Sequence, residues 1–84
     1  MKKNEGDAKG RETLLRLGHR IVLIRNQKKI SQLSLSLKAG VSKSYVSDLE
    51  NGRRNPSVLV LRRIASALKT PLSSLFEEKE ESTF

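Results

Sequence analysis

The chain has 84 residues, one histidine, no cysteine and a net charge of +8. These values predict a single small domain and exclude a disulfide framework, a thiolate zinc site and a metal centre, which His19 could not build alone. No apolar run approaches the roughly 20 residues that cross a bilayer, and the N-terminus lacks the apolar segment of a signal peptide, so we expect a cytoplasmic protein without a membrane partner.

The positive charge fills most of the chain and reverses at the C-terminal end. Residues 77–84 carry four glutamates and one lysine, whereas residues 1–76 hold 16 basic and 5 acidic side chains, a net charge of +11. A small domain with such an excess attracts polyanions, and nucleic acid is the commonest of these. The alternative is a basic domain that is merely soluble.

The first predicted element is a polar N-terminal arm over residues 1–12, which shows no apolar periodicity and is interpreted as flexible. A first helix is expected from Thr13, a possible N-cap, to about Gln27 or Lys28. Apolar residues recur on one face of this helix at spacings of three and four, namely Leu14, Leu17, Ile21 and Ile24.

Two short helices joined by a tight turn follow. Ser31 is predicted to cap a second helix over residues 32–39, and Gly40 to end it in a left-handed conformation. Ser42 then caps a third helix that runs to about Asn51, where Gly52 closes it. Three linking residues suit a sharp bend between helices rather than a hairpin of long ones.

The rest of the domain is predicted to be a basic loop over residues 53–56 and two more helices. Ser57 caps a fourth helix, and Thr70 caps a short fifth one that has Pro71 in its first turn. The side chains expected in the core here are Val58, Leu61, Ile64, Ala65, Leu68, Leu72, Leu75 and Phe76. The sequence therefore predicts an all-α, compact five-helix domain over residues 13–76, followed by a flexible acidic tail at 77–84.

The ordered run of these motifs is similar to the Cro/C1-type (XRE) helix-turn-helix family, which includes phage repressors. The similarity covers about residues 16–76 and is carried by segments 31–36, 39–42, 45–52, 55–57 and 64–68. It implies a bundle of the phage-repressor type with a central helix-turn-helix, a double-stranded DNA operator as partner and no cofactor. It also implies a transcription regulator of bacterial or phage type, associated with the nucleoid.

In this reading, the helix that begins near Ser42 places its first turns at base edges in the major groove. Lysine can donate to guanine O6 and N7, aspartate can accept from cytosine N4, and serine can do either. The alternative is an ordinary solvated helix face. The base-reading residues that the resemblance implies are Gln32, Lys43, Ser44, Tyr45, Ser47 and Asp48.

A second set of polar and basic residues is expected to contact phosphates, which positions a protein on DNA without reading sequence. The set is Gln32, Lys38, Ser42, Asn51, Arg53, Arg54 and Asn55. Asn51 could instead serve only as a helix stop. The resemblance further implies an ion pair between Arg25 and Glu50 that orients the recognition helix.

Several residues depart from the family pattern. Lys29 and Lys69 stand where glycine is usual, so each must adopt a left-handed backbone or the helix ends must differ. Ser36 replaces a small alanine, and its hydroxyl needs a partner such as a carbonyl one turn back. Extra apolar residues suggest an interface: Val22, Leu23, Leu37 and Leu59.

We therefore expect a symmetric homodimer through the helix 4–5 region, including Leu59 and Leu72, on a palindromic operator. The alternative function is an antitoxin-type protein that binds DNA and also a partner toxin protein. An enzyme is not expected, because no nucleophile, base and carboxylate arrangement is present. RNA binding usually relies on aromatic stacking, and this chain offers only Tyr45, Phe76 and Phe84.

Overall fold

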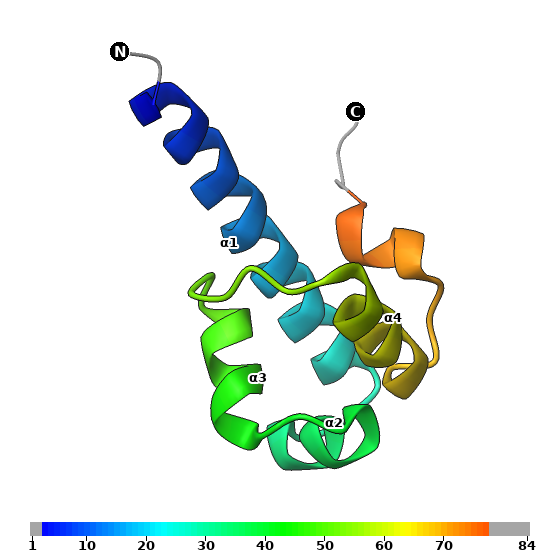
Figure 1. Ribbon diagram of the computed structural model, residues 1–84. Coiled ribbons are helices and arrows are strands. Elements are labelled where there is room, and N and C mark those ends of the chain that lie inside the picture. The colour runs from blue at the N-terminus through cyan, green and yellow to red at the C-terminus, as the bar shows by residue number, and fades with distance from the viewer. Residues whose placement is uncertain (1–2, 78–84) are drawn as a thin grey trace.

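The computed structural model describes the backbone of residues 3–77 and the side chains from residue 8 onward, and this part of the chain contains helices and no strand (Figure 1). The helices are α1 (Lys3–Gln27), α2 (Gln32–Ala39), α3 (Lys43–Glu50), α4 (Val58–Ala67) and the 3-10 helix η1 (Leu72–Phe76). The predicted all-α class is confirmed. The fifth element differs from the prediction, because it is a 3-10 helix and not an α-helix.

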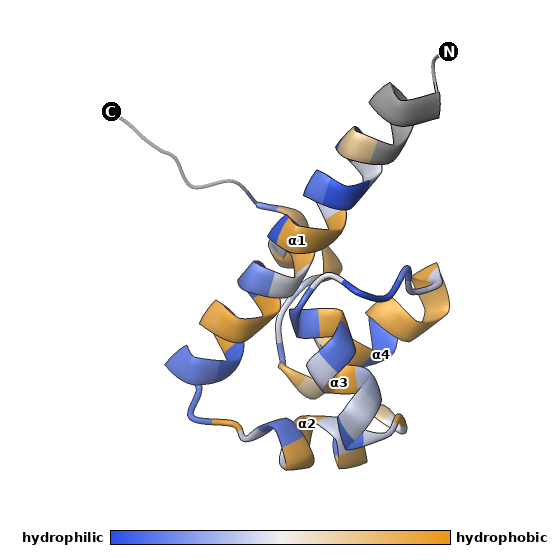
Figure 2. Ribbon diagram, turned by 90° about the vertical axis from the view of Figure 1, so that its left-hand side faces the viewer, coloured by the Kyte–Doolittle hydropathy of each residue, from blue (hydrophilic) through white to orange (hydrophobic). Residues whose placement is uncertain are grey.

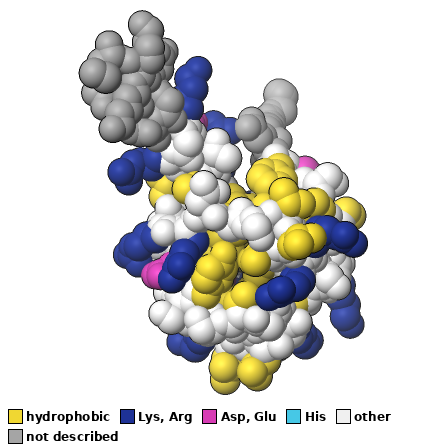
Figure 3. Space-filling model, viewed as in Figure 1, with side chains coloured by type: hydrophobic (Ala, Val, Ile, Leu, Met, Phe, Trp, Pro, Cys, Tyr) yellow, Lys and Arg dark blue, Asp and Glu magenta, His cyan; other side chains and the backbone are white. Residues whose placement is uncertain are grey.

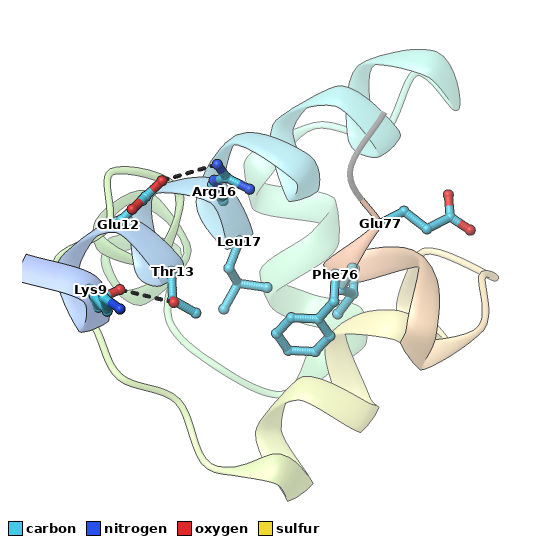
Figure 4. A pocket seen from close by; sticks show the side chains of 8 residues that line it. Lys9, Glu12, Thr13, Arg16, Leu17, Phe76 and Glu77 are labelled. Atoms are coloured by element: carbon cyan, nitrogen blue, oxygen red, sulfur yellow. Dashed lines mark hydrogen bonds and ion pairs between the residues drawn. The ribbon is translucent and has the colours of Figure 1, made fainter. Parts of the chain in front are cut away.

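The first helix begins ten residues earlier than predicted. Thr13 is not an N-cap: it lies within α1, and its hydroxyl donates to the carbonyl of Lys9 at 3.0 Å (Figure 4). The interpretation of residues 1–12 as an arm is therefore wrong from Lys3 onward, while residues 1–2 lie outside the described residues. A helix that continues outward from a packed segment needs no new nucleus, so it does not require an apolar stripe of its own. Figure 1 shows this part of α1 projecting beyond the bundle.

Three serines begin the next three α-helices, as predicted. The hydroxyl oxygens of Ser31, Ser42 and Ser57 accept hydrogen bonds from the backbone N–H three residues on, at 3.0, 2.9 and 3.1 Å. Each bond satisfies an N–H group that has no partner within its helix. The helix boundaries therefore follow directly from residues visible in the sequence.

The two lysines at unusual positions do adopt the left-handed backbone. Lys29 has a φ of 59° and Lys69 a φ of 56°. This left-handed conformation is energetically unfavourable for residues that have a side chain. The backbone N–H of Thr70 donates to the carbonyl of Ala65 at 3.0 Å, so Thr70 completes the end of α4. It does not cap the fifth element, whose N-cap is Pro71.

The core is formed by apolar side chains from all five elements. Ile21, Leu35, Val46, Ile64 and Leu68 are fully buried and surrounded by the rest of the core cluster. The buried hydroxyl of Ser36 donates to the carbonyl of Leu33 at 2.7 Å, the partner that was predicted. No helix in the described range is long and apolar enough to cross a membrane.

Two residues predicted for the core lie mostly outside it. Val58, the first residue of α4, is 65% exposed, and Phe76 at the end of η1 is 49% exposed. Each is the terminal residue of its element, Val58 at the start of α4 and Phe76 at the end of η1. Arg20 ties η1 to α1, because it donates to the Ser74 carbonyl at 2.7 Å and pairs with Glu77 at 2.8 Å. The remainder of the predicted acidic tail, 78–84, lies outside the described residues.

Candidate nucleic-acid interface

The turn between α2 and α3 is fixed by its own backbone and by a side chain from α4. Gly40 has a φ of +73°, and its N–H and that of Val41 donate to the Ser36 carbonyl at 2.9 and 3.0 Å. Arg63 of α4 donates to the carbonyls of Ala39 and Gly40 at 3.0 and 3.3 Å. Sequence reasoning missed Arg63, because only the folded arrangement brings it to the turn.

The third helix has a buried face and an outward face. Val46 and Leu49 are buried, as predicted, whereas Lys43 and Ser44 in the first turn are exposed. Tyr45 is half-buried against the core, and Ser47 and Asp48 are half-buried as well. Figure 2 shows α3 mostly in the blue and white of polar residues. The side chains most available to a ligand on this helix are therefore in its first turn.

The C-terminal end of α3 is held by a polar network. The guanidinium of Arg25 donates to both oxygens of Glu50, at 2.7 and 3.2 Å, and to the carbonyl of Ile30 at 3.0 Å. The amide nitrogen of Gln32 donates to Glu50 at 2.8 Å. The side chains of Arg25 and Glu50 are only 14% and 5% exposed, so the predicted ion pair is present and nearly enclosed.

A close backbone contact lies beside this network. A methyl group added at Gly18 of α1 would lie 2.5 Å from the carbonyl oxygen of Glu50 and 2.6 Å from that of Leu49. The backbones of α1 and α3 therefore approach each other so closely that no side chain larger than that of glycine fits between them. Sequence reasoning did not single out Gly18, although a glycine inside an apolar helical pattern often marks such an approach.

The loop after α3 carries exposed basic and amide side chains that fold back on that helix. Arg53 and Arg54 lie 3.5 and 3.6 Å from the carboxylate of Asp48, and the Arg54 guanidinium stacks 4.9 Å from the centre of the Tyr45 ring. Asn51 donates to the Ser47 carbonyl at 2.8 Å and serves as a helix stop. Asp48, predicted to read bases, therefore already faces two arginines.

The structure separates some of the predicted residues from this surface. Lys38 lies in an open hollow between the end of α2 and α4, together with Leu37, Leu59 and Arg62. Leu37 and Leu59 are 74% and 68% exposed. Leu72, the second residue predicted for a dimer interface, is half-buried and packs against the core.

The geometry is that of two short helices at a fixed turn, with the second helix anchored at one end and polar and exposed at the other. The helix-turn-helix family model matches residues 21–75, which is more than half of the chain. This chain belongs to the Cro/C1-type helix-turn-helix family.

Curated relatives of this helix-turn-helix protein are repressors and transcription regulators. It is 40% identical over 63 residues to the immunity repressor protein of Bacillus phage phi105, a match that covers 75% of this chain and 44% of the repressor. It is 38% identical over 69 residues to the transcriptional regulator SinR of Bacillus subtilis (strain 168), covering 81% of this chain and 62% of SinR. The chain thus spans less than two thirds of the length of both relatives.

A solved structure matches three quarters of the helix-turn-helix protein over nearly the whole length of the solved chain. The restriction-modification controller protein C.AhdI from Aeromonas hydrophila is 35% identical, with a TM-score of 0.74, and the match covers 75% of this chain and 96% of the controller. The fold of the bundle is therefore that of a known controller protein, and the relatives are regulators rather than enzymes.

Proposed function

We propose that this protein is a sequence-specific transcription regulator that reads the major groove of bacterial or phage DNA with the first turn of α3. The observation that supports this most directly is the asymmetry of that helix. Its C-terminal end is held by Arg25, Gln32 and Gly18, while Lys43 and Ser44 are exposed. A held helix with free polar side chains in its first turn is what base reading requires.

Tyr45, Ser47 and Asp48 have a secondary part in this proposal. Each is half-buried, and the carboxylate of Asp48 is shared by Arg53 and Arg54, so a cytosine amino group would compete with these two arginines for it. Gln32 is engaged with Glu50 through its amide nitrogen. We therefore expect Gln32 to brace α3 more than to read bases.

The phosphate contacts in this proposal come from residues around the ends of α2 and α3. Arg53, Arg54 and Asn55 are exposed, and a phosphate contact there would position the domain without reading sequence. Ser42 is exposed at the N-terminus of α3. Backbone N–H groups and the helix dipole favour an anion at this place. Lys38, in its separate hollow, has the weakest support.

The regulator is further proposed to act as a homodimer on a palindromic operator. Leu59 supports this proposal, because a leucine that is 68% exposed beside another that is 74% exposed forms an apolar surface on α4 and α2. Two-fold symmetry would place two α3 helices about 34 Å apart, one DNA turn.

Light scattering of the parent protein at micromolar concentration should give the mass of a dimer, and light scattering of Leu59→Glu should give that of a monomer. A monomeric parent protein would contradict the homodimer alone.

The experiment that tests the proposed function is selection of bound sequences from random duplex DNA by the full chain. We expect an enriched motif with two inverted half-sites whose centres are about one helical turn apart. Lys43→Ala should enrich a more degenerate motif, whereas Lys9→Ala, an exposed lysine on α1, should enrich the parent motif. Recovery of no motif by the parent protein would contradict sequence-specific binding.

A further inference from the structure

A second basic surface lies beside the recognition helix, where α1 meets the loop after α3. An open hollow there is lined by Gly10, Arg11 and Leu14 of α1 and by residues 52–55 of the loop. It brings Arg11, Arg53 and Arg54 together on one concave surface. The family match begins at residue 21, so the α1 side of this hollow lies outside the matched segment.

The place of Arg11 is fixed by packing between the two segments. Gly52 has a φ of +74°, and a methyl group added to it would lie 2.7 Å from the Leu15 side chain. The loop is therefore seated directly on α1 at Leu15. Arg11 precedes Leu15 by four residues, so it lies on the same side of the helix, one turn or about 6 Å further out.

The charges of the hollow are only partly balanced. Within the described residues, Arg11 is exposed and has no acidic partner, while Arg53 and Arg54 share the single carboxylate of Asp48. Arg54 also stacks on Tyr45 of α3, so one residue of the hollow contacts the recognition helix. Figure 3 shows basic side chains gathered along the edge formed by α3 and the outer half of α1.

We infer that Arg11 is a phosphate-contacting residue and that, with Arg53 and Arg54, it forms a second site for the phosphodiester backbone of the duplex whose major groove α3 reads. This inference rests on the proposed function. A guanidinium binds a phosphate through two parallel N–H donors, and α1 holds Arg11 in the same hollow as Arg53 and Arg54. The outward extension of α1 thereby lengthens the DNA footprint beyond the helix-turn-helix.

Arg11→Ala tests this inference, with Arg16→Ala as the matched control. Both residues are exposed arginines of α1, and both variants lose one positive charge. Arg16, however, lines a hollow with Leu17 and Phe76 on another side of the helix and not the one beside the loop (Figure 4). Binding is measured as a function of salt on the selected duplex and on a scrambled duplex of equal length.

Arg11→Ala should reduce the slope of log K against log salt by about one for each subunit bound, and should weaken binding about five- to tenfold per subunit near 0.1 M salt. Both duplexes should lose affinity equally, because a phosphate contact carries no sequence information. Arg16→Ala should stay within about twofold of the parent protein, as expected for a change in long-range charge alone.

The inference is overturned if Arg11→Ala keeps the parent slope, or if both variants lose the same affinity, since the effect would then be one of net charge. Failure of the proposed function gives a different result. The parent protein would then enrich no sequence, and the Arg11–Arg16 comparison would still be decided on the scrambled duplex. Circular dichroism of both variants should match the parent protein, because both side chains are exposed.

Discussion

The two ends of α3 differ in how much they are tied to the rest of the molecule. At the C-terminal end, Glu50 is 5% exposed, bound by Arg25 and Gln32, and its backbone touches Gly18. At the N-terminal end, Lys43 and Ser44 are exposed, and the bond that fixes the helix is the Ser42 cap at 2.9 Å. The difference indicates that the direction of the helix is set at one end, so residues at the other end can change without loss of the fold.

The largest expected effect comes from removing the carboxylate at the tied end. Glu50→Ala leaves the Arg25 guanidinium nearly enclosed without its counter-charge, which should cost about 3–5 kcal/mol of unfolding free energy. Asp48→Ala is the matched control on the same helix, because its contacts are longer and its side chain is 32% exposed. It should cost about 0–1 kcal/mol. Urea denaturation measures both, and equal losses would mean that the enclosed network does not set the stability of this end.

The next effect concerns the backbone contact at the same end. Gly18→Ala would force α1 and α3 apart, since the new methyl meets backbone atoms that cannot rotate away. Gly10→Ala is the matched control in the same helix, with nothing within 4 Å of the new methyl. Both variants gain the same helix propensity, so their difference isolates the overpacking cost, about 1–3 kcal/mol.

Thermal denaturation of the two glycine variants should therefore shift in opposite directions, with Gly10→Ala more stable than the parent protein and Gly18→Ala less stable. Two variants of equal stability would indicate that α3 moves away from α1 at no cost. The tied end of α3 would then be held by Arg25 and Gln32 alone.

A third prediction addresses the free end. Lys43→Ala should change the unfolding free energy by less than about 0.5 kcal/mol, because the side chain is exposed. It should reduce discrimination between the selected duplex and one with the contacted base pair changed by about 1–3 kcal/mol. Arg53→Ala is the comparison variant and should weaken binding to both duplexes equally. Unchanged discrimination in Lys43→Ala would remove this residue from base reading.

The sequence was sufficient to predict features that depend on local chemistry. The caps at Ser31, Ser42 and Ser57 and the left-handed Gly40 follow from hydrogen bonding and steric rules within a few residues. The partner of Glu50 was predicted differently, since it came from the family resemblance and not from the pattern of the residues. In each case the information lies in a short segment or in a recurrent arrangement of the family.

Features that depend on how segments meet could not be predicted in the same way. The outer half of α1 lacks an apolar stripe, so its helicity comes from continuity with the packed half. Arg63 lies 24 residues from the Ala39 carbonyl that it contacts, and nothing near it in the sequence indicates this contact. The pairing of Asp48 with Arg53 and Arg54 also appears only when the loop folds back on α3.

The smallest effect is predicted for the turn between α2 and α3, which leads into the free end of α3. Arg63→Ala removes hydrogen bonds to the carbonyls of Ala39 and Gly40 and should cost about 1 kcal/mol of unfolding free energy. Arg62→Ala is the control, because this neighbouring arginine is exposed and makes no hydrogen bond or ion pair within the described residues. It should change stability by less than about 0.5 kcal/mol. If Arg63→Ala is no more destabilising than Arg62→Ala, the turn is held by Gly40 and the Ser36 carbonyl alone. The angle between α2 and α3 would then be a property of the helix-turn-helix segment and not of the bundle around it.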